Sequence, residues 1–145
     1  MQRVEHRIIM GAAPSEVFAY ISDLDRLAEW QTGVTEARRT SDGAMRVGAT
    51  AQVTRELMGQ RIEAPLTVTE FAPPNRLAVE SEVSGVRALA TLEVEPSGVD
   101  SELTFAMEIR GSMLTAFMEP MIAGAAGGDI KASLERLRER FAQPR

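Results

Sequence analysis

Few side chains of this 145-residue chain are placed to do polar chemistry inside an apolar core. Arg55 is the clearest case, because it shares the phase of an alternating strand with Ala51 and Val53. An unpaired buried guanidinium is costly, so inside the protein Arg55 must lie at a cavity mouth, find a carboxylate or meet an anionic ligand group. The alternative is that a bulge or the strand end turns Arg55 into solvent.

His6 and Tyr20 are the other two residues whose chemistry could serve a reaction. His6 is the only histidine and shares a strand phase with Ile8 and Met10; it is either a general acid or base or a hydrogen-bonded structural residue. Tyr20 is either a packing residue on a helix face or a hydroxyl group in a pocket. No spacing decides between these alternatives, so no catalytic residue is assigned. If the protein is an enzyme, Arg55, His6 and Tyr20 are the candidates.

The composition argues against several other kinds of site. The chain has no cysteine and one histidine, which excludes thiolate nucleophiles, disulfides and cysteine-based zinc sites and argues against a histidine metal centre. No paired carboxylates or glycine-rich phosphate loop is recognisable, so neither a metal nor a cofactor is expected. A net charge of −5 argues against nucleic-acid binding. The lack of a signal region or a long apolar span predicts a cytoplasmic protein without an integral membrane segment.

The elements that must position these residues indicate an α+β fold. Alternation predicts a first strand over 4–10, two short helices follow it after Pro14, and the two helices cover about 15–21 and 24–31. Further strands are expected at 34–40, 49–58, 61–71, 76–83, 86–95 and 102–110, separated by short turns. Such a succession predicts an antiparallel meander. No linker or repeat divides the chain, so a single domain over 1–145 is expected.

The C-terminal segment changes to a helical period. One apolar stripe runs along it, at Ile130, Leu134, Leu137 and Phe141. The helix is expected to begin near Met113, but Pro120 and three glycines at 124, 127 and 128 interrupt it, at a propensity cost of about 6 kcal/mol relative to alanine. A kink or break is therefore predicted there, with Asp129 as a cap for a new helical segment.

Particular residues accompany this order of elements. They are Ile8-x-Met10-x-Ala12-x-Pro14-x-x-Val17-Phe18, then Ile21-Ser22-Asp23 and Glu29-Trp30. With them the whole chain resembles the polyketide cyclase/dehydrase-like (SRPBCC) group of the START and pollen-allergen superfamily. The resemblance implies the helix-grip fold, in which a curved antiparallel sheet wraps around a long C-terminal helix. It also implies a hydrophobic ligand, because members bind lipids, sterols, hormones and polyketides, and some are cyclases.

Small residues on the helix predict where a cavity lies. Traced backwards from Ile130, the apolar stripe passes through Ala126 or Gly127 and then Ala123, so space is expected under 116–127, whereas the stripe from Ile130 onwards is expected to be plain core. The alternative is that the glycines allow close packing without a void. The nearby residues Phe117, Met118 and Met121 either form part of the pocket wall or fill an ordinary core. The resemblance places Trp30 near the entrance, although a core anchor is equally consistent with the sequence.

The inward phases of the strands are otherwise aliphatic, which suits binding better than proton transfer. The expected ligand-binding residues are Trp30, Val53, Arg55, Leu66, Val79, Ser81, Ala90, Leu92, Phe105, Met107, Phe117, Met118, Met121, Ala123 and Gly127. The first hypothesis is binding or transport of a small hydrophobic ligand (lipid, sterol or polyketide-like) by a monomer or weak homodimer. The second is a polyketide aromatase/cyclase or dehydratase. The third is a protein-interaction or stress-response module that uses an exposed sheet edge.

Overall fold

The computed structural model describes residues 2–57, 59–83, 85–111 and 118–141. Strand β1 (Gln2–Met10) leads into helix α1 (Pro14–Ile21), a 3-10 turn η1 (Leu24–Arg26) and helix α2 (Leu27–Trp30). The following strands are β2 (Val34–Arg39), β3 (Thr50–Leu57), β4 (Gln60–Ala72), β5 (Arg76–Val83), β6 (Val86–Ser97) and β7 (Asp100–Gly111). Helix α3 (Glu119–Arg140) completes the described fold.

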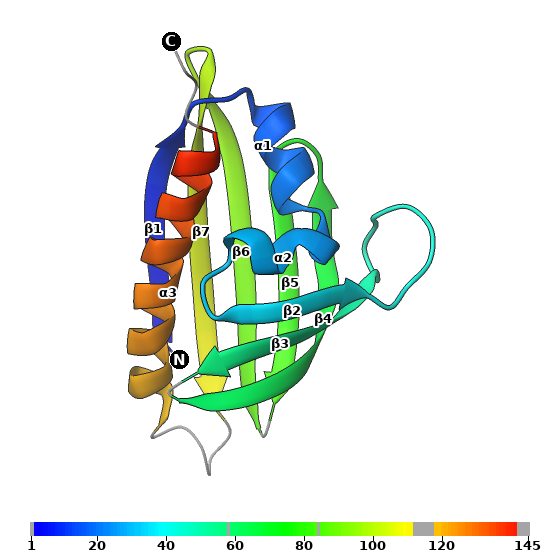
Figure 1. The fold of residues 1–145 in the computed structure, drawn as a ribbon, viewed down its shortest axis with the longest axis vertical. Helices are drawn as coiled ribbons and strands as arrows, with labels where there is room; N and C mark the ends of the chain where they lie inside the picture. Colours follow the sequence, from blue (N-terminus) through cyan, green and yellow to red (C-terminus); the bar gives the residue numbers. More distant parts are fainter. Residues whose placement is uncertain (1, 58, 84, 112–117, 142–145) are drawn as a thin grey trace.

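The strands form one seven-stranded antiparallel sheet in the order β1-β7-β6-β5-β4-β3-β2. The β2–β7 segment is a meander, and β1 closes it by pairing with β7 from Gln2 opposite Ile109 to Met10 opposite Ser101. Figure 1 shows α3 lying along β1 and β7, while α2 and β2 cross in front of the middle of the sheet. The helix-grip architecture that the sequence predicts is confirmed.

Alternating side chains give the sheet its apolar inner face. On β3, Ala51 and Val53 are each 1% exposed, and on β7 Leu103 and Phe105 are at most 1% exposed. Successive strand residues point to opposite faces, so each strand contributes every second side chain to one core. The same alternation carries Arg55 to the inner face of β3.

Helix α3 differs from the prediction, because one helix runs from Glu119 to Arg140. The expected break is wrong. Pro120 lies in the first turn, where a missing N–H costs no helical hydrogen bond. Gly127 has a packing reason, because a Cβ there would lie 3.2 Å from Cγ1 of Val4 on β1. The expected start near Met113 lies outside the described residues.

Candidate functional site

A cavity of about 420 Å³ lies between the inner face of the sheet, the short helices and α3. Ligand sites in proteins commonly occupy about 300–1,000 Å³. Most of the lining is apolar, and the sheet wall includes several of the residues that the strand phases predict: Val53, Leu66, Val79, Ser81, Ala90, Leu92, Phe105 and Met107. Trp30 and Met118 also line it. The cavity therefore lies where the aliphatic phases converge.

Helix α3 presents a different face to this cavity from the one expected. Met121 is 60% exposed, Ala123 is buried outside the lining and Gly127 packs against β1. The face that lines the cavity is Met118, Ile122, Ala126, Asp129, Ile130 and Ser133. Of the predicted stripe, Ile130 and Ala126 line the cavity, whereas Ala123 and Gly127 each lie one residue beyond a lining position, and one residue rotates a helix by about 100°. The expectation of plain core from Ile130 onwards fails at Ile130 and Ser133, and Phe117 lies outside the described residues.

Sequence reasoning missed several residues of the wall. Residues of the short helices and of the turn after α2 belong to it because the chain folds this segment over the open side of the sheet: Ile21, Leu24, Leu27, Gln31 and Thr32. Further strand residues could have been found from the same phases that gave the others, for example Ile62, Ala64, Leu77, Val83, Ala88 and Ile109. The helix residues follow only once the true phase of α3 is known.

Arg55 brings a positive charge to the wall. Its Nη2 donates a hydrogen bond to Oε1 of Gln31 at 3.3 Å, the sole hydrogen bond of this side chain in the described part of the chain. A guanidinium carries five N–H donors, so most remain available. Burial lowers the pKa of Arg55, while the nearby carboxylate of Asp129 opposes that shift. The group nevertheless stays charged, as arginine does in proteins.

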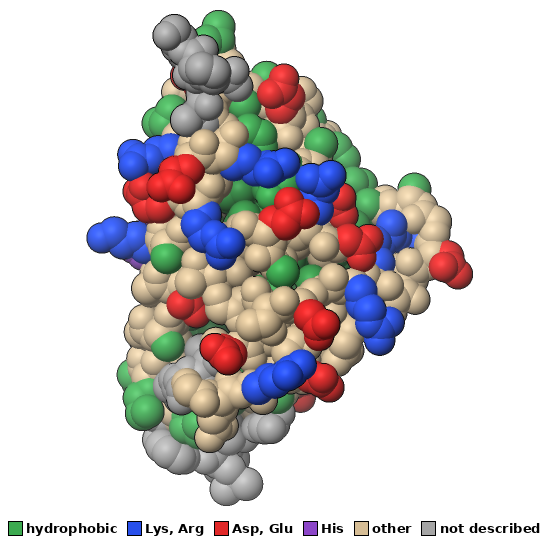
Figure 2. Space-filling view, in the orientation of Figure 1, with side chains coloured by type: hydrophobic (Ala, Val, Ile, Leu, Met, Phe, Trp, Pro, Cys, Tyr) green, Lys and Arg blue, Asp and Glu red, His purple; other side chains and the backbone are tan. Residues whose placement is uncertain are grey.

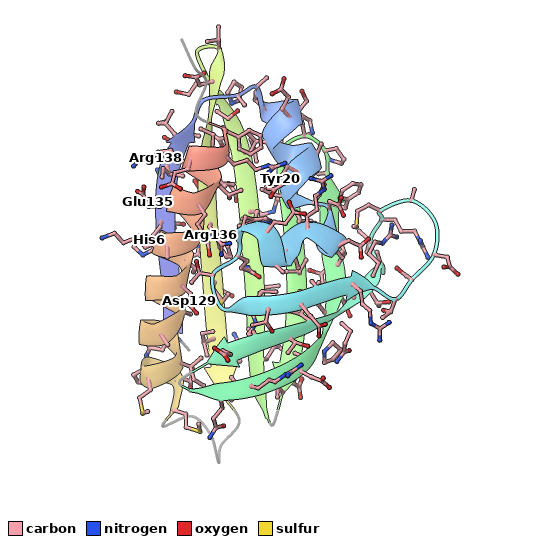
Figure 3. All side chains as sticks on the ribbon, in the orientation of Figure 1. His6, Tyr20, Asp129, Glu135, Arg136 and Arg138 are labelled. Atoms are coloured by element: carbon pink, nitrogen blue, oxygen red, sulfur yellow. The ribbon has the colours of Figure 1, made fainter. Side chains whose placement is uncertain are left out.

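Asp129 on α3 brings the opposite charge to the same end (Figure 3). Burial raises the pKa of Asp129, and attraction by Arg55 partly offsets the increase. No ion pair within 4.0 Å joins these two side chains among the residues described. Arg55 and Asp129 thus interact electrostatically, and both line the cavity. We name the set of Gln31, Arg55 and Asp129 the polar end of the cavity.

Backbone contacts fix the position of Asp129. The Thr32 N–H donates to Oγ of Ser133 at 2.8 Å, and this hydroxyl donates to the Asp129 carbonyl at 2.6 Å. Gly33 has φ +93°, and a Cβ there would lie 3.0 Å from Oδ2 of Asp129. Both the left-handed backbone and the close approach favour glycine. The loop between α2 and β2 therefore packs against α3 at Asp129 and holds the helix there.

Trp30 is a core anchor that also forms part of the cavity wall. It is 1% exposed, and its ring lies edge-on to Phe105 with centroids 6.0 Å apart. The indole Nε1 is buried and has no hydrogen-bond partner among the described residues. An unpaired buried donor is unfavourable, at about 1–3 kcal/mol.

His6 and Tyr20 do not line the cavity. His6 is half-buried on β1 (Figure 3). The Tyr20 hydroxyl donates to Oε1 of Glu29 at 3.1 Å, and the guanidinium of Arg140 lies 4.1 Å from the ring centroid. Burial, followed by the hydrogen bond with Glu29, raises the pKa of Tyr20. These contacts join α1, α2 and the end of α3, which is a structural role.

Other kinds of site find little support on the molecule. Within residues 2–57, 59–83, 85–111 and 118–141, no group of three or more potential metal ligands occurs. Among the helices described, none has the length and apolarity that crossing a bilayer requires. Figure 2 shows basic and acidic side chains interspersed over the visible face, without a patch of one sign. Among the described residues, the cavity is therefore the best-supported candidate for a functional site.

Comparisons with known proteins agree with this geometry. The model of the family described as "Polyketide cyclase / dehydrase and lipid transport" matches residues 1–142. A protein of Mycobacterium tuberculosis named Toxin Rv0910 is 24% identical over 143 residues, covering 98% of this chain and 99% of the relative.

Two solved structures share the fold. A START superfamily protein from Mycobacterium smegmatis has a TM-score of 0.80 at 13% identity, with 96% of each chain covered. The di-domain ARO/CYC BexL from the BE-7585A biosynthetic pathway has a TM-score of 0.76 at 18% identity, covering 96% of this chain and 46% of that one. With the family model matching nearly its whole length, this chain belongs to the polyketide cyclase / dehydrase and lipid transport family.

Proposed function

We propose that this protein binds a small hydrophobic molecule in the cavity between the sheet and α3. The observation that carries the proposal is a void of about 420 Å³ with a largely apolar wall. Protein interiors are close-packed, with few voids larger than a water molecule, because an empty space forfeits dispersion contacts. The family description, with its cyclases and lipid transport, supports the same class of ligand.

The volume limits the size of the ligand. An engineered apolar cavity of about 150 Å³ accommodates benzene, with its six carbons. By proportion, a cavity of about 420 Å³ accommodates about 17 non-hydrogen atoms. Two or three fused rings or a medium-length acyl chain have this size.

Two measurements test this proposal. Native mass spectrometry of the purified protein should detect a co-purified ligand of this size. Thermal-shift screening should show stabilisation by bicyclic and tricyclic aromatics and by medium-chain alcohols, because a ligand that binds only the folded state raises the melting temperature. Lack of stabilisation by every compound of this size would overturn the proposal.

Catalysis of polyketide cyclisation or dehydration is a second candidate. Two observations favour it: the fold shared with the ARO/CYC protein BexL, and a guanidinium in the cavity wall. Enclosing a flexible poly-β-ketone chain would select one folded conformation, and Arg55 would polarise a carbonyl oxygen. Incubation with a reactive poly-β-ketone should change the product ratio relative to buffer, and Arg55→Ala should abolish the change. A product ratio equal to that in buffer would contradict this candidate.

A third candidate is a protein-interaction or stress-response role, favoured by the name of the relative Toxin Rv0910. Induced expression in a bacterial host provides the test. This role predicts growth arrest that persists when Ala126→Leu reduces the cavity, because the activity would then depend on the surface of the protein. Normal growth under induction would contradict it.

A further inference from the structure

We propose that the polar end of the cavity selects a neutral ligand group that carries a hydrogen-bond acceptor beside a donor, in preference to a carboxylate. A primary amide, an enolised β-diketone or a hydroxy ketone has this pattern. The inference rests on the proposed function, because it concerns the head group of the ligand that the apolar wall holds. It is carried by the cross-cavity arrangement of Arg55 and Asp129.

Arg55 is the reason why the ligand group must carry a hydrogen-bond acceptor. Its guanidinium lines the cavity and uses one of its donors on Gln31, at 3.3 Å. Arginine is the cationic side chain with a rigid fork of donors, so a carbonyl or enolate oxygen placed near it would receive at least one strong hydrogen bond. A purely hydrocarbon ligand would leave these donors without an acceptor, which is unfavourable in a cavity from which water is displaced.

Asp129 is the reason why the ligand group must also carry a hydrogen-bond donor. Its carboxylate lines the same cavity, and its side-chain oxygens accept no hydrogen bond within the part of the chain that the structure describes; Ser133 donates to its main-chain carbonyl instead. An ionised carboxylate is purely an acceptor. A hydroxyl or N–H group of a ligand therefore satisfies it, whereas a ketone or ester oxygen does not.

The preference for a neutral group follows from the charge balance. Arg55 and Asp129 carry opposite charges that already offset each other at this end. The other carboxylate in the wall, Glu80, is paired with Nε of Arg87 at 2.9 Å and supplies no free charge. A ligand carboxylate would gain the attraction of Arg55 but would lie beside the like charge of Asp129, and the repulsion between the two carboxylates would oppose that gain.

The arrangement is also fixed before a ligand arrives. Ser133 ties α3 to the N–H of Thr32, and Gly33 lets the backbone pass Oδ2 of Asp129 closely. On the opposite strand, the Glu56 N–H donates to the Gly33 carbonyl at 2.7 Å, which holds β3 beside the same loop. Ordering costs at binding are therefore small, and the hydrogen-bonding pattern of the ligand decides its affinity.

Three probes with one ring system test the inference. 2-Naphthamide offers an acceptor and a donor, 2-acetonaphthone an acceptor alone, and 2-naphthoate an anion of the same shape. Calorimetric titration at pH 7 should give the amide about tenfold tighter binding than the ketone, the effect of one further hydrogen bond to a charged group. Naphthoate should bind about tenfold more weakly than the amide.

Variants separate the contributions. Asp129→Asn should strengthen naphthoate binding about tenfold and leave the amide no tighter than in the wild type, so that the variant binds the anion at least as tightly as the amide. Arg55→Met should weaken the amide and the ketone alike. Glu135→Gln is the matched control, because it removes a carboxylate from α3 that pairs with Arg138 at 2.6 Å outside the cavity, and all three affinities should change less than about twofold.

The outcomes distinguish the two proposals. Equal binding of the three probes, or tightest binding of naphthoate by the wild type, overturns the head-group inference while ligand binding stands. A naphthoate affinity that Asp129→Asn and Glu135→Gln change equally overturns it as well. Failure of all three probes to bind overturns the proposed function together with the inference.

Discussion

Filling the cavity from α3 should stabilise the protein and remove its binding site. Ala126 is 8% exposed and lines the cavity, so a larger side chain there enters existing space. Ala126→Leu adds three methylene equivalents at about 0.8 kcal/mol each, an upper limit of about 2.4 kcal/mol. Leucine loses about 0.5–1 kcal/mol of side-chain entropy on burial, which leaves a net gain of about 1.5 kcal/mol.

Urea unfolding of the ligand-free protein measures this gain. At about 4 °C per kcal/mol for a chain of this size, the melting temperature in a thermal scan should rise by about 6 °C. Ala132→Leu is the matched control, because Ala132 is exposed on the same helix and the same substitution should change stability by less than about 0.5 kcal/mol. The neutral dye N-phenyl-1-naphthylamine should bind Ala126→Leu at least about tenfold more weakly than Ala132→Leu.

A loss of stability in Ala126→Leu, instead of the expected gain, would refute the reasoning. Overpacking a filled core costs about 1–3 kcal/mol. If Ala126→Leu destabilises the protein by 1 kcal/mol or more, the space beside Ala126 is not available to a side chain, and a ligand could not occupy it either.

Three further predictions concern the polar end. Gly33→Ala should lower the free energy of unfolding by about 1–2 kcal/mol more than Gly48→Ala, since both glycines have φ +93° but only Gly33 approaches another side chain; equal losses in chemical denaturation would exclude the close contact. Ser133→Ala should cost about 1–3 kcal/mol, because it leaves the Thr32 N–H without its acceptor, and a neutral result would show that water replaces the hydroxyl. Burial raises the pKa of Asp129 above its unfolded value of 3.8, so the folded protein binds this proton more tightly than the unfolded chain. The stability that the protonated carboxyl contributes is present below the unfolded pKa and is lost as pH rises through the folded pKa. The unfolding free energy of the wild type minus that of Asp129→Asn should therefore fall between pH 3 and 7, and a rise would contradict the direction of the shift.

The strand residues that line the cavity were predictable because the alternation of a strand depends on a single condition, a sheet with one buried face. A strand with one buried face must alternate, so the phases that place Ala51 and Val53 inside also place Arg55 inside. Whether Arg55 reached the cavity or solvent depended on the absence of a bulge in β3 before that residue. The pairing of β3 with β4 continues without a register shift from Thr50 to Leu57, so β3 has no bulge against β4 and Arg55 keeps the inward phase.

The helix face was not predictable to the same accuracy. Tracing the stripe backwards from Ile130 at a constant 100° per residue leaves a choice between Ala126 and Gly127, and local sequence does not decide which of the two faces the cavity. Asp129 was interpreted as a cap because a polar residue after two glycines has that pattern. Its actual role depends on contacts with Gly33 and Ser133 that exist only in the folded protein, so local sequence carries no signal for them.

The central claim is that the protein binds a small hydrophobic molecule inside the cavity. Nuclear Overhauser effects between bound 2-naphthamide and methyl-labelled protein test it most directly. Contacts should appear with the methyl groups of Ala90, Leu92 and Ala126, which line the cavity, and not with those of the exposed residues Val99 and Ala132. Contacts with Val99 or Ala132 in place of the cavity methyl groups would contradict the account.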